Sequence, residues 1–106
     1  MAIVRGVEDG TVTLYVAGGG AAALRAPSIR SELDAIADGR IREVALDISE
    51  LTILDSAGVA AAVSLHERLL RRGCELRIVG VCEQPARVFE LLGLDRALRI
   101  ERRRLA

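Results

Sequence analysis

The 106-residue chain is poor in several residue types, and each shortage argues against a class of function. It has no tryptophan, one phenylalanine and one tyrosine, so it lacks the aromatic platform on which single-stranded nucleic acids stack. It has no lysine and a formal net charge of zero, which leaves no broad basic patch for nucleic acid. Two cysteines and one histidine cannot supply four zinc ligands without help from carboxylates. We therefore expect neither a nucleic-acid partner nor a metal.

The chain also lacks long apolar runs. None approaches the ~20 residues that a membrane-spanning helix needs, and Met1–Arg5 lacks the apolar core of a signal peptide. Without an export signal, Cys74 and Cys82 are expected to be reduced, structural thiols. With 51% hydrophobic and 28% charged residues, the composition is globular, and the length suits one domain over residues 1–106. We expect a cytoplasmic protein without membrane insertion.

Apolar periodicity and turn residues predict the strands. Two strand-like runs, Ile3–Glu8 and Thr11–Ala17, are joined by Asp9-Gly10, a pair typical of tight hairpins because glycine tolerates positive φ. The remaining strands are expected at Glu43–Ile48, at Glu75–Val81 and, as a short strand or turn, at Leu98–Ile100.

Helices are predicted between these strands, at about Pro27–Ala37, Ser56–Arg72 and Gln84–Leu92. A glycine follows each of them within two residues, at Gly39, Gly73 and Gly93, and glycine commonly ends a helix. A hairpin followed by alternating helices and strands predicts the α/β class. We expect one small mixed β-sheet of four to five strands, with parallel pairs made by right-handed crossovers and helices packed on it.

The stretch Leu51–Gly58 is the strongest candidate for a site. It leads from a buried strand into a helix, and Asp55 is a residue type that caps helix N-termini. Ser56, Ala57 and Gly58 would then form the first helical turn, so a hydroxyl lies there beside small residues. A helix N-terminus favours an anion by roughly 0.3–1 kcal/mol, and the fold should tolerate a phosphate on Ser56. From spacing alone, an ordinary helix cap remains the alternative.

An enzymatic role for Ser56 finds no support in its neighbours. The only imidazole, His66, lies ten residues further along the same predicted helix, or about 15 Å away at the helical rise, so it cannot activate this hydroxyl. We expect His66 to be a satisfied, half-buried residue. Asp47 and Asp55 are explained as a strand-end residue and a helix cap, so no acid–base pair is supported. We expect no catalysis.

Two further clusters are interpreted as structural. Gly18, Gly19, Gly20 and Ala21 follow the second predicted strand, but they match neither common phosphate-binding motif and have no lysine with them, which favours a flexible connection. The only basic cluster, Arg102–Arg104, is expected to be a solvated tail.

A longer motif resembles a known family. Leu46-Asp-Ile-Ser49, four further residues, and then Leu54-Asp-Ser-Ala-Gly-Val59 are similar to the signature of the STAS domain, named after sulfate transporters and anti-sigma factor antagonists. The resemblance extends over nearly the whole chain and includes Pro85–Asp95, which is similar to the family's closing helix. It implies a small STAS-like domain.

The resemblance also implies a function. In the antagonists, the serine after the signature aspartate is phosphorylated by an anti-sigma factor with GHKL-type serine kinase activity, and by position this residue is Ser56. The unphosphorylated protein would bind the anti-sigma factor and release the sigma factor, and phosphorylation would abolish binding. The kinase supplies ATP, so no cofactor is expected. Whether the protein is a monomer or a weak dimer stays open.

The expected docking surface is the N-terminal end of the Ser56 helix with the loops Gly18–Leu24 and Val81–Gln84, because open α/β sheets bind beyond the carboxyl ends of their strands. Asp55, Ala57, Gly58 and the run Gly18–Ala21 belong to it. This run departs from the family, which often has Gly-x-Leu-Asp there, whereas no acid occurs in it here. A pure docking module need not retain that acid. The alternative is therefore a constitutive STAS docking subunit, such as the STAS component of an Mla-type lipid ABC transporter.

Overall fold

The chain begins with the predicted hairpin, formed by β1 (Ala2–Glu8) and β2 (Thr11–Val16). Its turn residues Asp9 and Gly10 have φ values of 50° and 81°, and a tight turn between twisted strands requires positive φ at both positions. The computed structural model describes residues 2–17 and 41–104. The helix predicted at about Pro27–Ala37 lies outside the described residues.

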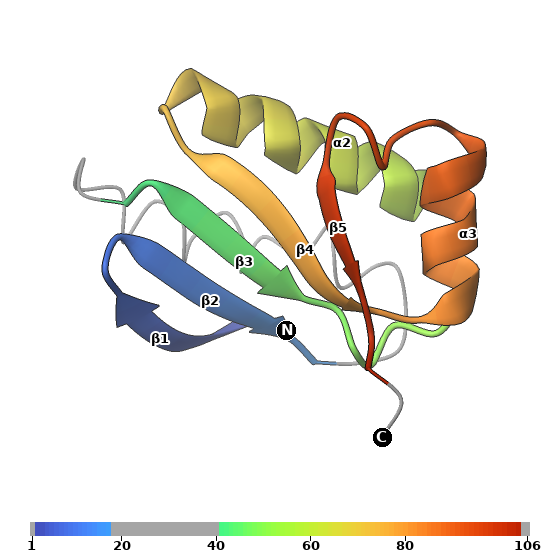
Figure 1. Cartoon of the computed structure of the whole chain (residues 1–106), viewed down its shortest axis with the longest axis horizontal. Coiled ribbons are helices and arrows are strands. Elements are labelled where there is room, and N and C mark those ends of the chain that lie inside the picture. Colours follow the sequence, from blue (N-terminus) through green and yellow to red (C-terminus); the bar gives the residue numbers. More distant parts are fainter. Residues whose placement is uncertain (1, 18–40, 105–106) are drawn as a thin grey trace.

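Three further strands extend the hairpin into a five-stranded sheet of order β1-β2-β3-β4-β5 (Figure 1). They are β3 (Glu43–Asp47), β4 (Glu75–Val81) and β5 (Arg99–Arg102). β1 pairs with β2 antiparallel, and every later pair is parallel. The predicted mixed sheet is confirmed, and the last strand runs two residues past the predicted Leu98–Ile100.

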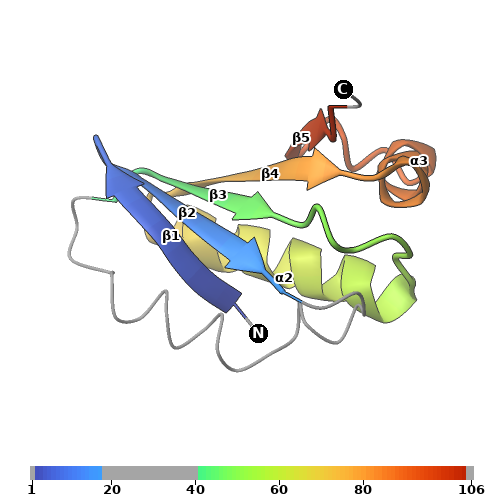
Figure 2. The same ribbon diagram turned by 90° about the horizontal axis from the view of Figure 1, so that it is seen from below.

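Two described helices connect the parallel strands. α2 (Ser56–Arg71) joins β3 to β4 and lies along one face of the sheet, and α3 (Glu83–Leu91) joins β4 to β5 and lies beside β5 (Figure 2). Both match their predicted positions to within one residue at each end. Because β3 and β4 are parallel neighbours, a single right-handed crossover suffices to place α2 over the sheet.

The core lies between α2 and one face of the sheet. The alternating pattern of β2 is confirmed, because Val12, Leu14 and Val16 are buried while the residues between them are only half-buried. The other strands and the helices complete the core with Val44, Leu46, Leu76, Ile78, Ala62, Leu65, Leu69 and Phe89. Burial of this apolar surface, at roughly 25 cal/mol per Å², holds the helices on the sheet.

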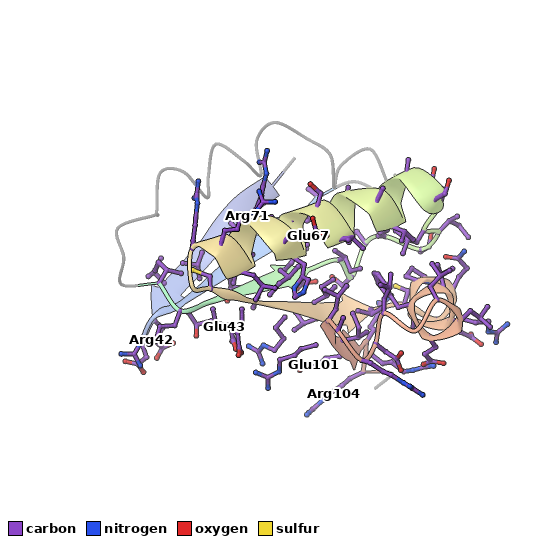
Figure 3. All side chains as sticks on the ribbon, turned by 90° about the horizontal axis from the view of Figure 1, so that it is seen from above. Arg42, Glu43, Glu67, Arg71, Glu101 and Arg104 are labelled. Carbon is purple, nitrogen blue, oxygen red and sulfur yellow. The ribbon has the colours of Figure 1, made fainter. Side chains whose placement is uncertain are left out.

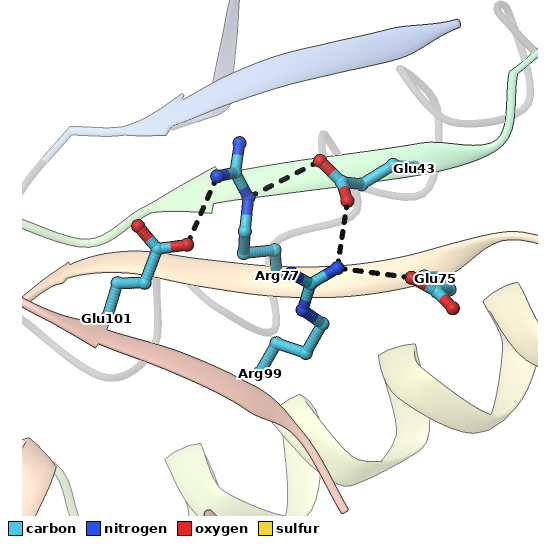
Figure 4. A network of polar contacts seen from close by, with 5 residues as sticks. All are labelled: Glu43, Glu75, Arg77, Arg99 and Glu101. Carbon is cyan, nitrogen blue, oxygen red and sulfur yellow. Dashed lines mark hydrogen bonds and ion pairs between the residues drawn. The ribbon is translucent and has the colours of Figure 1, made fainter.

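The opposite face of the sheet carries a network of ion pairs (Figure 4). Arg77 lies 3.3 Å from Glu43 and 3.1 Å from Glu101, and Arg99 lies 3.5 Å from Glu43 and 3.4 Å from Glu75. Arg77 Nε lies close to Glu43, but no described residue is placed to accept a hydrogen bond from it. Arg77 and Glu43 at its centre are half-buried, whereas Glu101, Arg99 and Glu75 are more than half exposed. Exposed pairs such as Arg99–Glu75 contribute about 0–1 kcal/mol each, so the outer part of the network keeps the face compatible with water more than it stabilises the fold.

The two faces of the molecule differ accordingly. Figure 3 shows Glu43 and Glu101 on the side of the sheet opposite to α2, whereas Glu67 and Arg71 project from the outer surface of α2. Among residues 2–17 and 41–104, no helix covers the charged face.

Candidate functional site

The first turn of α2 forms as its sequence predicts. Asp55 has the extended backbone of an N-cap residue, with φ −101° and ψ 179°, and its Oδ1 accepts a hydrogen bond from the Gly58 N–H at 2.8 Å. The Asp55 carbonyl accepts from the Val59 N–H at 3.0 Å, which starts the helical ladder. A side-chain cap of this kind is worth about 1 kcal/mol. The predicted role of Asp55 as a cap is confirmed.

Ser56 is the first residue of α2, and its side chain is exposed. The first turn contains no acidic residue, and within the described part of the chain nothing accepts a hydrogen bond from the Ser56 and Ala57 N–H groups. Free amides and the positive end of the helix dipole both favour an anion at this place. The hydroxyl of Ser56 therefore lies where added negative charge costs the fold little.

The loop that leads to Ser56 starts with a close contact between two strands. Asp47 Oδ1 accepts a hydrogen bond from the Ser49 N–H at 2.9 Å and so closes the turn after β3. Beside it, β4 passes through Gly80 with φ +67°, and a Cβ on Gly80 would lie 2.9 Å from Asp47 Oδ1 and 3.0 Å from Ser49 Cβ. Asp47 is thus the strand-end residue that we predicted. Gly80 was not singled out from the sequence.

The same loop is held at its other end by a side chain from α3. The Leu54 N–H donates to Gln84 Oε1 at 2.7 Å, and Gln84 Nε2 donates to the Leu54 carbonyl at 3.2 Å. The Cys82 thiol donates to the Ser49 carbonyl at 3.4 Å. The loop before Ser56 and the start of α3 are therefore fixed to each other, although they lie 30 residues apart in sequence.

The structure thus brings together two of the three segments predicted to form the docking surface. The loop before α2 adjoins the segment Val81–Gln84 through the hydrogen bonds between Leu54 and Gln84, and Ile53, the residue before Leu54, exposes 61% of its surface. The third segment, Gly18–Leu24 with Gly18, Gly19, Gly20 and Ala21, lies outside the described residues.

The match to a family model decides the family of this chain. A model of the STAS domain matches residues 5–104. The chain belongs to the STAS family. The resemblance found in the signature segment is confirmed over nearly the whole chain.

Solved structures share the fold of this STAS domain. An anti-sigma factor antagonist from Mycobacterium paratuberculosis has a TM-score of 0.72 at 21% identity, over 95% of this chain and 84% of that one. A sulfate transporter family protein from Wolinella succinogenes has a TM-score of 0.70 at 22% identity, over 92% and 80%. The Bacillus cell fate determinant SpoIIAA in its phosphorylated form has a TM-score of 0.67 at 18% identity, over 94% and 90%. Identities this low show the fold alone.

A relative found by sequence is the low affinity sulfate transporter 3 of Stylosanthes hamata. It is 36% identical over 50 residues, which are 47% of this chain. They are also only 8% of the transporter, so this STAS domain corresponds to a small part of that protein.

The remaining polar candidates of this STAS domain do not assemble into a second site. His66 is half-buried on α2 as expected, but its Nδ1 is buried without a partner among the described residues, so the expectation of a satisfied imidazole was wrong for this atom. Cys74 and Cys82 are free thiols. In residues 2–17 and 41–104, no three histidine, cysteine or acidic side chains gather as metal ligands, and neither helix is long and apolar enough to cross a bilayer.

Arg102–Arg104 differs from the solvated tail that we predicted. All three residues are exposed, but Arg102 is the last residue of β5, and the Arg103 N–H donates to the Val81 carbonyl at 2.8 Å. The pairing with β4 therefore fixes the start of this basic cluster against the sheet. Sequence periodicity gave no signal for this extension, because arginines do not mark a strand.

Proposed function

We propose that this STAS domain is an anti-sigma factor antagonist of a bacterial cytoplasm. Its unphosphorylated form binds an anti-sigma factor with GHKL-type serine kinase activity and so releases the sigma factor. The observation that carries the proposal is the exposed Ser56 hydroxyl at the capped start of α2. The shared fold with the Mycobacterium paratuberculosis antagonist and with phosphorylated SpoIIAA supports it.

The proposed switch acts through charge at the interface. A phosphate on Ser56 adds about −1.5 to −2 charges to a helix end that favours anions, so the fold is kept. A partner carboxylate docked ~6 Å from that phosphate would be repelled by roughly 3 kcal/mol at an effective dielectric of about 20, which is more than a hundredfold in affinity. Phosphorylation therefore releases the partner without unfolding the domain.

The proposal assigns no catalysis to this chain, and the kinase supplies ATP. His66 lies ten residues beyond Ser56 on one continuous helix, so no imidazole reaches the hydroxyl. Ser56 is thus the proposed acceptor of a phosphoryl group and not a nucleophile activated by its own fold. Asp55, Ala57, Gly58 and the run Gly18–Ala21 are its proposed neighbours in the docked complex.

Phosphoryl transfer tests the proposal directly. The purified chain, incubated with a kinase-type anti-sigma factor encoded in its own genome and with ATP, should gain one phosphate, and mass spectrometry should place it on Ser56. Ser56→Ala should abolish transfer. Ser64→Ala is the matched control, because Ser64 is an exposed serine on the same helix. The Ser64→Ala variant should accept phosphate on Ser56 as wild type does. Transfer to Ser56→Ala at the wild-type rate would refute the assignment.

A second candidate is a constitutive docking subunit of a transporter assembly. The matches to a sulfate transporter family protein and to a sulfate transporter favour it. In that role the end of α2 would bind its partner permanently, and Ser56 would be only a helix residue. A transporter component that binds wild type and Ser56→Asp equally well would identify this second function.

A further inference from the structure

A cavity of about 750 Å³ lies beside the proposed docking surface, on the side of α3 and β5. Its walls come from the loop before α2, from the start of α3 and from the end of β5. We call it the arginine pocket and define it by Thr52, Gln84, Arg87, Arg102 and Arg103. The site at Ser56 does not use the cationic side chains of this pocket.

The lining of the arginine pocket is cationic. Three arginines and one glutamate, Glu83, leave it with a net charge of +2. Arg87 pairs with Glu83 at 3.3 Å and Arg102 pairs with Glu90, but Arg103 has no ion pair with any described residue. The Arg87 and Glu83 side chains are 68% and 81% exposed, and exposed pairs of this kind exchange readily for a better partner. The pocket can therefore offer at least two guanidinium groups to an incoming anion.

The arginine pocket is joined to the loop before Ser56 by two hydrogen bonds. Gln84 lines the pocket, and its amide makes both hydrogen bonds to the backbone of Leu54, two residues before Ser56. Thr52, also in the lining, lies two residues before Leu54 on the same loop. The hydrogen bond from the Arg103 N–H to the Val81 carbonyl fixes the side of the pocket formed by the end of β5. The pocket therefore adjoins the loop that carries Ser56, and a partner protein that covers the start of α2 lies next to it.

We propose that the arginine pocket is the second anchor of the docking surface and that it takes an acidic segment of the protein partner. Guanidinium groups form paired hydrogen bonds with carboxylates, so a segment with two or more aspartate or glutamate side chains fits their chemistry. The inference rests on the proposed function and adds the character of the partner to it. An acidic partner is attracted by the arginines and repelled by a phosphate on Ser56, so one property explains both binding and release.

Charge reversal in the pocket tests this anchor. The partner is the anti-sigma factor that phosphorylates Ser56. We would measure the dissociation constant of its complex with wild type, with Arg103→Glu and with Arg87→Glu. Each variant should bind roughly tenfold more weakly, because charges at an interface act on encounter and on salt dependence. Arg96→Glu is the matched control: Arg96 is an exposed arginine in the turn before β5 and does not line the pocket, so it should change affinity less than twofold. Circular dichroism should show that all variants are folded.

Salt separates this effect from a loss of packing. Between about 0.1 M and 1 M NaCl the screening length falls from ~10 Å to ~3 Å, so wild-type binding should weaken, and Arg103→Glu should lose most of that dependence. If the pocket variants bind like Arg96→Glu, the inference is overturned while the proposed function stands. If wild type neither binds nor accepts phosphate from any kinase-type anti-sigma factor of its genome, the proposed function fails and the inference fails with it.

NMR titrations with three ligands distinguish which kind of anion binds in the arginine pocket. In two-dimensional NMR, a tetraglutamate peptide should shift the amide signals of Gln84 and Arg103 in wild type, and it should leave the Gln84 signal unshifted in Arg103→Glu. Inorganic phosphate and ATP are titrated in parallel. If phosphate or ATP shifts these signals at concentrations where the peptide shifts none of them, an acidic peptide is not the occupant.

Discussion

At the scale of single residues, neighbouring positions at the start of α2 have separate tasks. Asp55 uses its carboxylate within the fold, as the acceptor for Gly58, and Ser56 leaves its hydroxyl to solvent. This separation lets a modification change the surface without removing the cap. The sequence predicted it because capping is local: the acceptor and donor are three residues apart.

Gly80 is a second residue whose structural role is defined, because β4 passes close to Asp47 and Ser49 at this position. Gly80→Ala should lower the free energy of unfolding by about 2–4 kcal/mol, because the new Cβ meets Asp47 and Ser49 and the residue must also keep a positive φ. This loss of unfolding free energy is measured by urea denaturation monitored by circular dichroism. Gly73→Ala is the control, since Gly73 has φ +75° but open space around its Cβ, and it should cost only about 1 kcal/mol. Equal losses would show that the contact with Asp47 does not matter.

At the scale of elements, the loop before α2 and the first turn of α3 behave as one unit because Gln84 binds Leu54 twice. The helix itself, its cap and its end at a glycine follow from neighbouring residues. The alignment of the loop on α3 depends on a contact between residues far apart in sequence. It gives the exposed residues Ile53 and Ser56 a fixed support beside the arginine pocket.

The variant Gln84→Ala tests whether Gln84 supports the loop before α2. Two part-buried hydrogen bonds are lost, and at ~0.5–1.5 kcal/mol each the free energy of unfolding should fall by about 1–3 kcal/mol. Hydrogen exchange of the Leu54 amide should accelerate at the same time. Glu83→Ala removes an exposed neighbour that makes only a surface ion pair, so it should change stability by less than about 1 kcal/mol and leave Leu54 exchange unchanged. An unaltered Leu54 amide in Gln84→Ala would contradict this role.

These contacts show why the sequence predicted the elements better than the site. The Asp9-Gly10 turn, the Asp55 cap and the alternation in β2 are signals within a few residues, and the structure confirms each. Gly80 against Asp47, Gln84 against Leu54 and Arg103 against Val81 join segments 22 to 33 residues apart. No local pattern specifies which distant segment a side chain reaches. The position of the surface around Ser56 was therefore predicted, but the contacts that support this surface were not.

At the scale of the whole molecule, the sheet separates two environments. One face is buried under α2, and the other carries charged pairs that suit water. The proposed docking surface lies at neither face but at the carboxyl ends of β3 and β4, where α2 and α3 begin. Val81 and Gly58 are buried there, but Asp55, Ser56 and Glu83 are exposed, so a change of charge at an exposed position can alter binding while the buried residues stay in place.

The central claim is that a phosphate on Ser56 switches binding and not folding. The most direct measurement is isothermal titration of the anti-sigma factor with the unphosphorylated and the stoichiometrically phosphorylated chain, together with the melting temperature of both forms. Phosphorylation should weaken binding more than a hundredfold, as roughly 3 kcal/mol of repulsion requires, and should leave the melting temperature nearly unchanged. Equal affinity of the two forms, or a phosphorylated chain that has unfolded, would contradict the account.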